Sequence, residues 1–176
     1  MKSVPAWIVL ALIALVAGLL LGVTNELTKA PIEESNAAAA EQGRREVMPA
    51  ADSFEQVEAP SGLDSLYKAI AGGEVIGVVS SVTVAGYGGD VEIIVGMDND
   101  GVVTGISVGG ADFSETPGLG AKAKDAEFTA QFAGKGFPIA LNADVDQITN
   151  ATITSTAVVD GVNAALEQMK AWMQGG

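Results

Sequence analysis

The sequence predicts an α+β protein in which an apolar N-terminal helix precedes a domain with a mainly antiparallel sheet and flanking helices. Segments rich in β-branched residues cluster in the middle of the chain, and helical patterns lie toward both ends. Short glycine-containing turns join neighbouring strand segments, and such turns connect antiparallel strands because parallel strands need long crossovers. A doubly wound parallel sheet is therefore not expected.

Residues 4–23 contain no charged side chain and consist mainly of Leu, Ile, Val and Ala. About twenty apolar residues are enough for a helix to span the hydrocarbon core of a bilayer. This run is longer than the apolar part of a secretory signal peptide, and no small-residue cleavage site follows Val23. We therefore predict that residues 1–25 form an uncleaved, single-pass transmembrane anchor rather than a signal peptide.

The charges around this segment predict its orientation. Lys2 and the amino terminus precede the apolar run, whereas Glu26 and a strongly acidic domain follow it. Because positive charges favour the cytoplasmic side, we expect the domain to lie on the extracytoplasmic side of the cell membrane. The lipid bilayer would then contact the chain through residues 4–23.

Residues 26–50 have the composition of a helical stalk or linker. The alanines of residues 37–40 favour helix, and Pro31 is expected at or near a helix start. Arg44 and Arg45 form a basic pair that is too small to indicate more than a solvated surface. The simplest interpretation is a spacer that leads away from the membrane.

The folded domain is expected over residues 51–176 and begins with a loop over residues 53–63. The predicted strands are 66–70, 75–84, 91–95 and 102–108, joined in pairs by Gly72-Gly73 and by Asp98-Asn99-Asp100-Gly101. An Asp-Gly pair between two β-branched segments is a hairpin turn. The acidic tetrad does not fit an EF-hand calcium loop, because Gly96 and Ser107 stand where acidic ligands are required.

Further elements are expected in the last third of the chain, namely a short helix over residues 126–132 and a strand over residues 137–141. From Ala157 onward, apolar residues recur at three- and four-residue steps, which predicts an amphipathic helix. One hydroxyl among those of Thr154, Ser155 and Thr156 is expected to cap this helix. Thr152, just upstream, would then lie where a helix N-terminus accepts an anion.

The overall composition excludes several functional classes. The chain has 176 residues and a formal net charge of −13, which argues against nucleic acid binding, because phosphates require a basic face. It contains no cysteine and no histidine, so it lacks thiolate ligands for an iron–sulfur cluster and the usual general base. We therefore expect no metal site and no catalytic residue. No dinucleotide fingerprint or P-loop follows a predicted strand.

Two blocks of sequence resemble motifs of the FMN-binding domain family. Residues 146–152, Asp-x-x-Thr-x-Ala-Thr, are similar to the flavinylation motif, in which the threonine corresponding to Thr152 is esterified to the FMN phosphate. The second block joins Tyr-Gly-Gly at residues 87–89 with Ser-Glu-Thr-Pro-Gly-Leu-Gly-Ala-Lys at residues 114–122. Together with the apolar N-terminal segment, these blocks most resemble the G subunit of the Rnf electron-transport complex.

The resemblance implies a covalent FMN, attached to Thr152 through a phosphoester, whose isoalloxazine ring packs on the loop that contains residues 115–122. The residues that it assigns to FMN binding are Tyr87, Gly88, Glu115, Thr116, Gly118, Leu119, Gly120, Lys122, Thr149, Ala151, Thr152 and Thr154. Lys122 or Lys124 would balance the charge of the flavin phosphate or that of a reduced anionic ring. The family usually has glycine where this chain has Asn150, and asparagine is a residue that tolerates the left-handed backbone.

The implied function is that of a membrane-anchored flavoprotein subunit that relays electrons. The flavin would carry the electrons, and the protein would set its position, potential and access. The implied partners are the other Rnf subunits, which move electrons between ferredoxin and NAD while translocating ions. A flavin transferase that uses FAD and a divalent metal would attach the FMN. The chain would then be an electron-transfer subunit that is not catalytic alone.

Several alternatives remain open from the sequence. A more distant resemblance links the chain to the C subunit of the sodium-pumping NADH:quinone reductase, and a free-standing anchored flavin carrier has the same motifs. A membrane-tethered module for a non-flavin ligand would use Thr152 only as part of a helix cap. A structural assembly subunit would use the acidic domain only to dock other chains.

Overall fold

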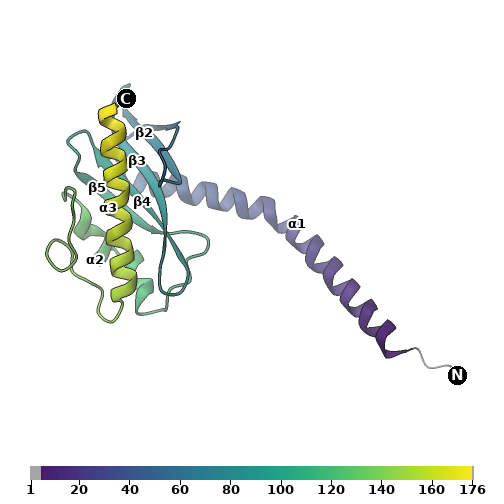
Figure 1. Cartoon of the computed structure of the whole chain (residues 1–176). Coiled ribbons are helices and arrows are strands. Elements are labelled where there is room, and N and C mark those ends of the chain that lie inside the picture. The colour runs from purple at the N-terminus through teal and green to yellow at the C-terminus, as the bar shows by residue number, and fades with distance from the viewer. Residues whose placement is uncertain (1–4, 176) are drawn as a thin grey trace. The chain divides into compact units, whose positions relative to one another are not determined.

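The computed structural model of the chain describes residues 5–175, so Lys2 and Val4, which entered the predictions above, lie outside the described residues (Figure 1). The chain forms two compact units, Met1–Ala39 and Ala40–Gly176. Helix α1 (Ala6–Val47) begins in the first unit and ends in the second.

The first unit is helical from Ala6 onward, and the side chains of residues 7–39 are exposed. By length and composition, α1 is apolar enough to cross a membrane. Pro31 lies inside the helix, so the expectation that it marks a helix start is wrong. A proline in a helix interior removes one backbone hydrogen bond, and the helix-favouring residues on both sides continue the helix in spite of that loss.

The second unit contains a five-stranded sheet in the order β1-β2-β3-β4-β5, with every neighbouring pair antiparallel. The strands are β1 (Ser53–Val57), β2 (Ser65–Ala71), β3 (Glu74–Ala85), β4 (Asp90–Asp98) and β5 (Val103–Gly109). Each strand pairs with the next one along the chain, so the sheet has no crossovers. The predicted α+β class with a mainly antiparallel sheet is therefore confirmed.

Both predicted hairpins are present. Gly72 and Gly73 have φ angles of 59° and 87° in the turn between β2 and β3, and Gly101 has a φ of 80° between β4 and β5. Asp98 is used inside its own turn, because its Oδ1 accepts the backbone N–H groups of Asp100 at 3.0 Å and of Val102 at 2.9 Å. This bonding is that of an Asx-type turn, which explains the acidic residue without a calcium ion.

Two segments differ from the prediction. Residues 53–57 were expected in a loop but form β1, an edge strand whose mostly exposed side chains give little apolar alternation. Residues 137–141 were expected to form a strand but do not. Pro138 has no N–H to donate to a ladder, and the side-chain amide of Asn163 instead bonds both the N–H and the carbonyl of Ile139, each at 2.8 Å.

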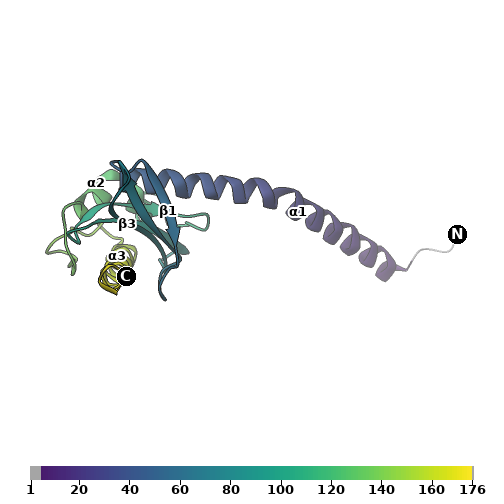
Figure 2. The same ribbon diagram turned by 90° about the horizontal axis from the view of Figure 1, so that it is seen from above.

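One face of the sheet forms the main core with α3 (Thr152–Gly175), which lies against that face in both views (Figures 1 and 2). Alternate residues of β4 point into this core, as the period of two in a strand requires. The short helices η1 (Gly120–Lys124), α2 (Ala126–Thr129) and η2 (Ala130–Phe132) close it on one side. The helix expected over residues 126–132 is thus present in two parts.

The last two turns of α1 pack against the opposite face of the sheet. Val47 is buried there with Val79 and Ile94, and the Thr104 hydroxyl donates to the Val47 carbonyl oxygen at 2.6 Å. The end of α1 lies close to β4 because Gly96 has no side chain. A Cβ on Gly96 would lie 2.8 Å from the Val47 carbonyl oxygen. The end of α1 is therefore part of the folded domain.

We predict that Gly96→Ala destabilises the domain by about 1–3 kcal/mol, because the added methyl group meets the Thr104 hydroxyl oxygen and the Val47 carbonyl oxygen, which are bonded to each other. Urea unfolding of the full chain, followed by Trp172 fluorescence in a Trp7→Phe background, measures the loss. Gly136→Ala is the matched control, since a Cβ at Gly136 meets no atom within 4 Å. Equal stability of the two variants would contradict the proposed close contact.

Candidate functional site

The N-terminus of α3 differs from the prediction. The helix begins at Thr152, so Thr154 and Ser155 lie in its first turn and do not cap it. Ser155 is fully buried, and its hydroxyl donates to the Ala151 carbonyl oxygen at 2.9 Å while accepting the Ile148 N–H at 3.0 Å. Asn150 has a φ of 62°, the left-handed conformation expected for a residue that replaces glycine. This turn leads the chain directly into the helix.

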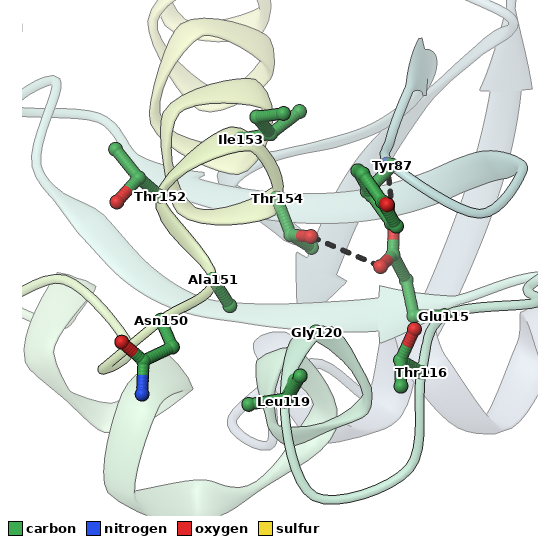
Figure 3. A pocket seen from close by; sticks show the side chains of 10 residues that line it. All are labelled: Tyr87, Glu115, Thr116, Leu119, Gly120, Asn150, Ala151, Thr152, Ile153 and Thr154. Atoms are coloured by element: carbon green, nitrogen blue, oxygen red, sulfur yellow. Dashed lines mark hydrogen bonds between the residues drawn. The ribbon is translucent and has the colours of Figure 1, made fainter.

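A cleft of about 570 Å³ opens beside this helix start (Figure 3). Its walls come from the loop between β3 and β4, the loop before η1, and the first turn of α3. The lining residues are Tyr87, Glu115, Thr116, Leu119, Gly120, Asn150, Ala151, Thr152, Ile153 and Thr154. Ligand sites of small molecules have volumes of roughly 300–1,000 Å³, so the cleft is large enough for a cofactor.

Glu115 joins the three walls. Its Oε1 accepts the backbone N–H of Tyr87 at 2.7 Å and that of Gly88 at 3.3 Å, and its Oε2 accepts the Thr154 hydroxyl at 3.0 Å (Figure 3). Glu115 is only 6% exposed and Thr154 only 1%. A buried carboxylate is costly unless its oxygens are bonded, and here both oxygens are.

Two glycines make room for this carboxylate. A Cβ on Gly120 would collide with Glu115 Oε2 and would lie 2.8 Å from the Thr154 hydroxyl oxygen. A Cβ on Gly86 would collide with Glu115 Oε1 and would lie 2.8 Å from Val91 Cγ2. The glycines of both loops therefore bring backbone close to Glu115.

Thr152 and Thr154 project from opposite sides of the first turn of α3 (Figure 3). The Thr154 hydroxyl is buried on Glu115, whereas Thr152 is exposed at the edge of the cleft. The Thr152 hydroxyl donates to Gln147 Oε1 at 3.2 Å. It is thus accessible to a reagent in solution, and its nearest bonded acceptor is a neutral amide.

The structure brings most, but not all, of the sequence-predicted residues together. The predicted residues that line the cleft are Tyr87, Glu115, Thr116, Leu119, Gly120, Ala151, Thr152 and Thr154. Gly88 contributes its N–H to Glu115, and Gly118 shapes the loop with a φ of 78°. Thr149 and Lys122 instead line a neighbouring cleft of about 390 Å³.

Neither lysine singled out from the sequence lines the first cleft. Lys122 lies in the neighbouring cleft with Asp125 and Asp146, and the Lys124 ammonium lies 3.8 Å from the centre of the Phe113 ring. Among the lining residues, all within the described part of the chain, Glu115 alone carries a charge. Ile153, which is 57% exposed, is a lining residue that was not predicted from the sequence. The signal that could have identified it is an apolar residue on the polar side of an amphipathic helix.

Two parts of the sequence match known protein families. Residues 86–167 match the family described as FMN-binding domain, and residues 8–47 match the RnfG N-terminal region. The G subunit of the Na(+)-translocating ferredoxin:NAD(+) oxidoreductase complex of Acetobacterium woodii is 35% identical, over 91% of this chain and 88% of the relative. The chain belongs to the family of Rnf G subunits. The G subunit of the ion-translocating oxidoreductase complex of Methanosarcina acetivorans is 32% identical over 93% of both chains.

The fold also has solved counterparts. The C subunit of the Na(+)-translocating NADH-quinone reductase from Parabacteroides distasonis superposes with a TM-score of 0.53 and 23% identity, over 64% of this chain and 63% of that one. NqrC of Shewanella oneidensis gives a TM-score of 0.50 with 22% identity, over 71% and 74% of the two chains. These likenesses establish the fold of the domain in this Rnf G subunit. The predicted resemblance to Rnf G subunits is confirmed by the identities with the G-subunit relatives.

The Rnf G subunit described here therefore carries an FMN-binding domain, and the cleft fits a flavin. Its exposed apolar side chains, Tyr87, Leu119 and Ile153, suit a flat aromatic ring system. Gly120, which is itself buried, lines the cleft wall, and the Thr152 hydroxyl is accessible at the edge of the cleft. The N-terminus of the 24-residue helix α3 favours a phosphate nearby.

We predict that Glu115→Ala frees the loop at Tyr87 and Gly88, because both amides lose their acceptor. The two amides should exchange hydrogen faster, and unfolding should become easier by about 2–3 kcal/mol from three lost hydrogen bonds. Amide exchange by mass spectrometry measures the first effect, and urea unfolding the second. Glu127→Ala, at an exposed position, is the control. Unchanged exchange at these two amides would contradict the bonding role of Glu115.

Proposed function

We propose that this chain relays electrons through FMN bound covalently to Thr152, as the G subunit of an ion-translocating Rnf complex. The supporting observation is the placement of Thr152: an exposed hydroxyl at the N-terminus of α3, on the edge of a cleft with apolar walls. FMN supplies the electron transfer itself. One relative is named as a subunit of a ferredoxin:NAD(+) oxidoreductase complex. We therefore propose that this chain is assembled into a complex of that kind.

In this proposal the Thr152 hydroxyl becomes a phosphoester. Its oxygen forms a bond to the FMN phosphorus of FAD, the pyrophosphate bond breaks, AMP leaves, and the hydroxyl proton passes to a base of a flavin transferase that also holds a divalent metal. An external enzyme is needed because the only acceptor bonded to Thr152 among the described residues is the neutral amide of Gln147. The exposure of Thr152 gives such an enzyme access.

The remaining residues would position the bound flavin. Tyr87, Leu119 and Ile153 would cover the apolar faces of the ring system, and Gly120 would let it approach the backbone. Thr116 lines the same cleft with its exposed hydroxyl, which would offer a hydrogen bond to the ring edge. Thr149 and Lys122, which line the neighbouring cleft, would contact the transferase rather than the ring.

We also propose a membrane topology. Residues 1–25 would form the single-pass anchor and residues 26–50 the stalk, whose last two helical turns pack on the sheet. Residues 51–176 would form the rest of the FMN-binding domain on the extracytoplasmic side. The exposed apolar side chains of residues 7–23 support the anchor, because such a surface is stable only in lipid or against a partner. A covalent bond would keep the flavin from being lost outside the cytoplasm.

A C subunit of a sodium-pumping NADH:quinone reductase remains the second candidate, because its fold is the same. The sequence identity favours the Rnf G subunit, since identities of 32–35% with G-subunit relatives over nearly the whole chain exceed the 22–23% found with the solved NADH:quinone reductase structures. Both candidates use the flavin in the same way, so the experiments on Thr152 apply to either. The set of proteins that copurify with the chain separates them.

We predict that co-expression with a flavin transferase adds the mass of one FMN less one water to the chain, and that Thr152→Ala abolishes the addition. Thr152→Ser should retain it, because the hydroxyl remains. Intact-mass spectrometry measures all three proteins. Thr156→Ala is the matched control, since it removes an exposed hydroxyl from the same helix outside the cleft. An unmodified wild-type chain beside a modified reference substrate would refute covalent attachment.

We further predict that Glu115→Gln raises the midpoint potential of the bound FMN by on the order of tens of millivolts. The carboxylate is the charged group of the cleft, and its negative charge opposes adding an electron nearby. Glutamine keeps the shape and one acceptor oxygen, so the loop at Tyr87 stays bonded. Spectroscopic redox titration measures the shift, with Glu127→Gln as control. Equal potentials in both variants would exclude an electrostatic role for Glu115.

A further inference from the structure

Arg44 and Arg45 are neighbours near the end of α1, but their surroundings differ. Arg45 is exposed and donates to Glu41 Oε1 at 2.9 Å, and this hydrogen bond and charge lower the pKa of Glu41. Arg44 is half-buried, and its guanidinium carbon lies 4.3 Å from the centre of the Tyr67 ring. The expectation that both are simply solvated surface is therefore wrong for Arg44.

The Arg44 guanidinium has no anionic partner within the described residues. Its Nε is buried without a hydrogen bond. A buried donor without a hydrogen bond lowers the stability of the folded state, so such donors are rare and call for an explanation. Stacking on Tyr67 holds the guanidinium in one place, which lowers the entropy lost when a ligand binds.

Three carboxylates lie near Arg44, those of Glu41, Asp52 and Glu92, and none of them forms an ion pair with it. Glu41 is bonded to Arg45, and Asp52 Oδ2 accepts the backbone N–H of Gly72 at 2.8 Å. The carboxylate of Glu92 is turned toward Gly110, where a Cβ would lie 3.2 Å from its Oε2. Arg44 therefore forms no ion pair within the described residues, although its charge contributes to the lowered pKa of Glu41.

Two hollows flank the stacked pair, and both are lined by Arg44 and Tyr67. One has about 230 Å³ and is lined by Ser65, Ser81 and Glu92, and the other has about 310 Å³ and is lined by Phe54, Glu41 and Asp52. The Ser65 and Ser81 hydroxyls are bonded to each other at 2.6 Å, which leaves one of the two O–H groups free to donate. Arginine and tyrosine are enriched among the residues that dominate protein interfaces. Hydroxyl donors beside a guanidinium suit a carboxylate, whose two oxygens accept several hydrogen bonds.

We propose that Arg44 binds a carboxylate side chain of another protein of the complex, in the hollows beside Tyr67. The proposal rests on the proposed membership of a multisubunit complex but not on the flavin. A protein carboxylate is favoured over an anionic lipid surface, because the chain carries a net charge of −13 and a negatively charged membrane would repel it as a whole. One fixed arginine can still bind one complementary acidic residue.

The test uses the full chain, loaded with FMN, and the remaining proteins of the complex in detergent. Arg44→Gln should weaken association at least about tenfold, and Arg44→Lys should weaken it less, because lysine keeps the charge but loses the planar fork. Arg45→Gln is the matched control and should leave association unchanged, since Arg45 is already paired within its own helix. Intact mass reports FMN attachment separately, so failure of attachment is distinguishable from failure of docking.

Salt dependence gives a second measurement that does not depend on the stability of Arg44→Gln. Association of the wild-type chain should weaken as salt rises, and Arg44→Lys, which keeps the charge, should show the same dependence with a lower affinity. Equal association of the Arg44 and Arg45 variants would overturn the proposal. Stronger binding of the wild-type chain to anionic than to neutral phospholipid vesicles, with the difference lost in Arg44→Gln, would overturn it in favour of lipid.

Discussion

The carboxylate of Glu115 holds the functional end of the domain together. It bonds the loop at Tyr87 and Gly88 to the first turn of α3 through Thr154, and the loop that carries Glu115 is the third wall. These segments are 27 to 39 residues apart in the sequence, so local turn preferences cannot align them. Because hydrogen bonds to a charged acceptor are stronger than neutral ones, one side chain can fix all three. The shape of the cleft, and hence the space beside Thr152, depends on this group.

Much of the fold follows from local chemistry that is visible in the sequence. The β-branched segments of β3 and β4 and the Asp-Gly turn before β5 specify antiparallel hairpins without reference to the rest of the chain. The errors occur where partners are distant. Residues 53–57 form a strand because β2 offers an open edge, and residues 137–141 do not, because the Asn163 side chain takes the hydrogen bonds that a neighbouring strand would have used.

The candidate site was also predicted only in part from the sequence. The two sequence blocks identify most of the residues that line the cleft, but spacing alone does not reveal that Thr152 and Thr154 face opposite ways. Nor does it reveal that Thr149 and Lys122 belong to a neighbouring hollow. The helix starts earlier than its apolar periodicity indicates, because Asn150 in a left-handed turn and the buried Ser155 hydroxyl set the boundary. Such polar contacts leave no periodic signal.

The contact between α1 and the back of the sheet affects how a water-soluble form of the domain should be cut. Truncation at the start of β1 would remove Val47 and uncover Val79 and Ile94, which are apolar and buried beneath it. Newly exposed apolar surface favours aggregation. The glycines of the sheet that lie against the end of α1 would then line an empty groove. A fragment that starts at Ala40, where the second compact unit begins, retains this cover while discarding the membrane-compatible segment.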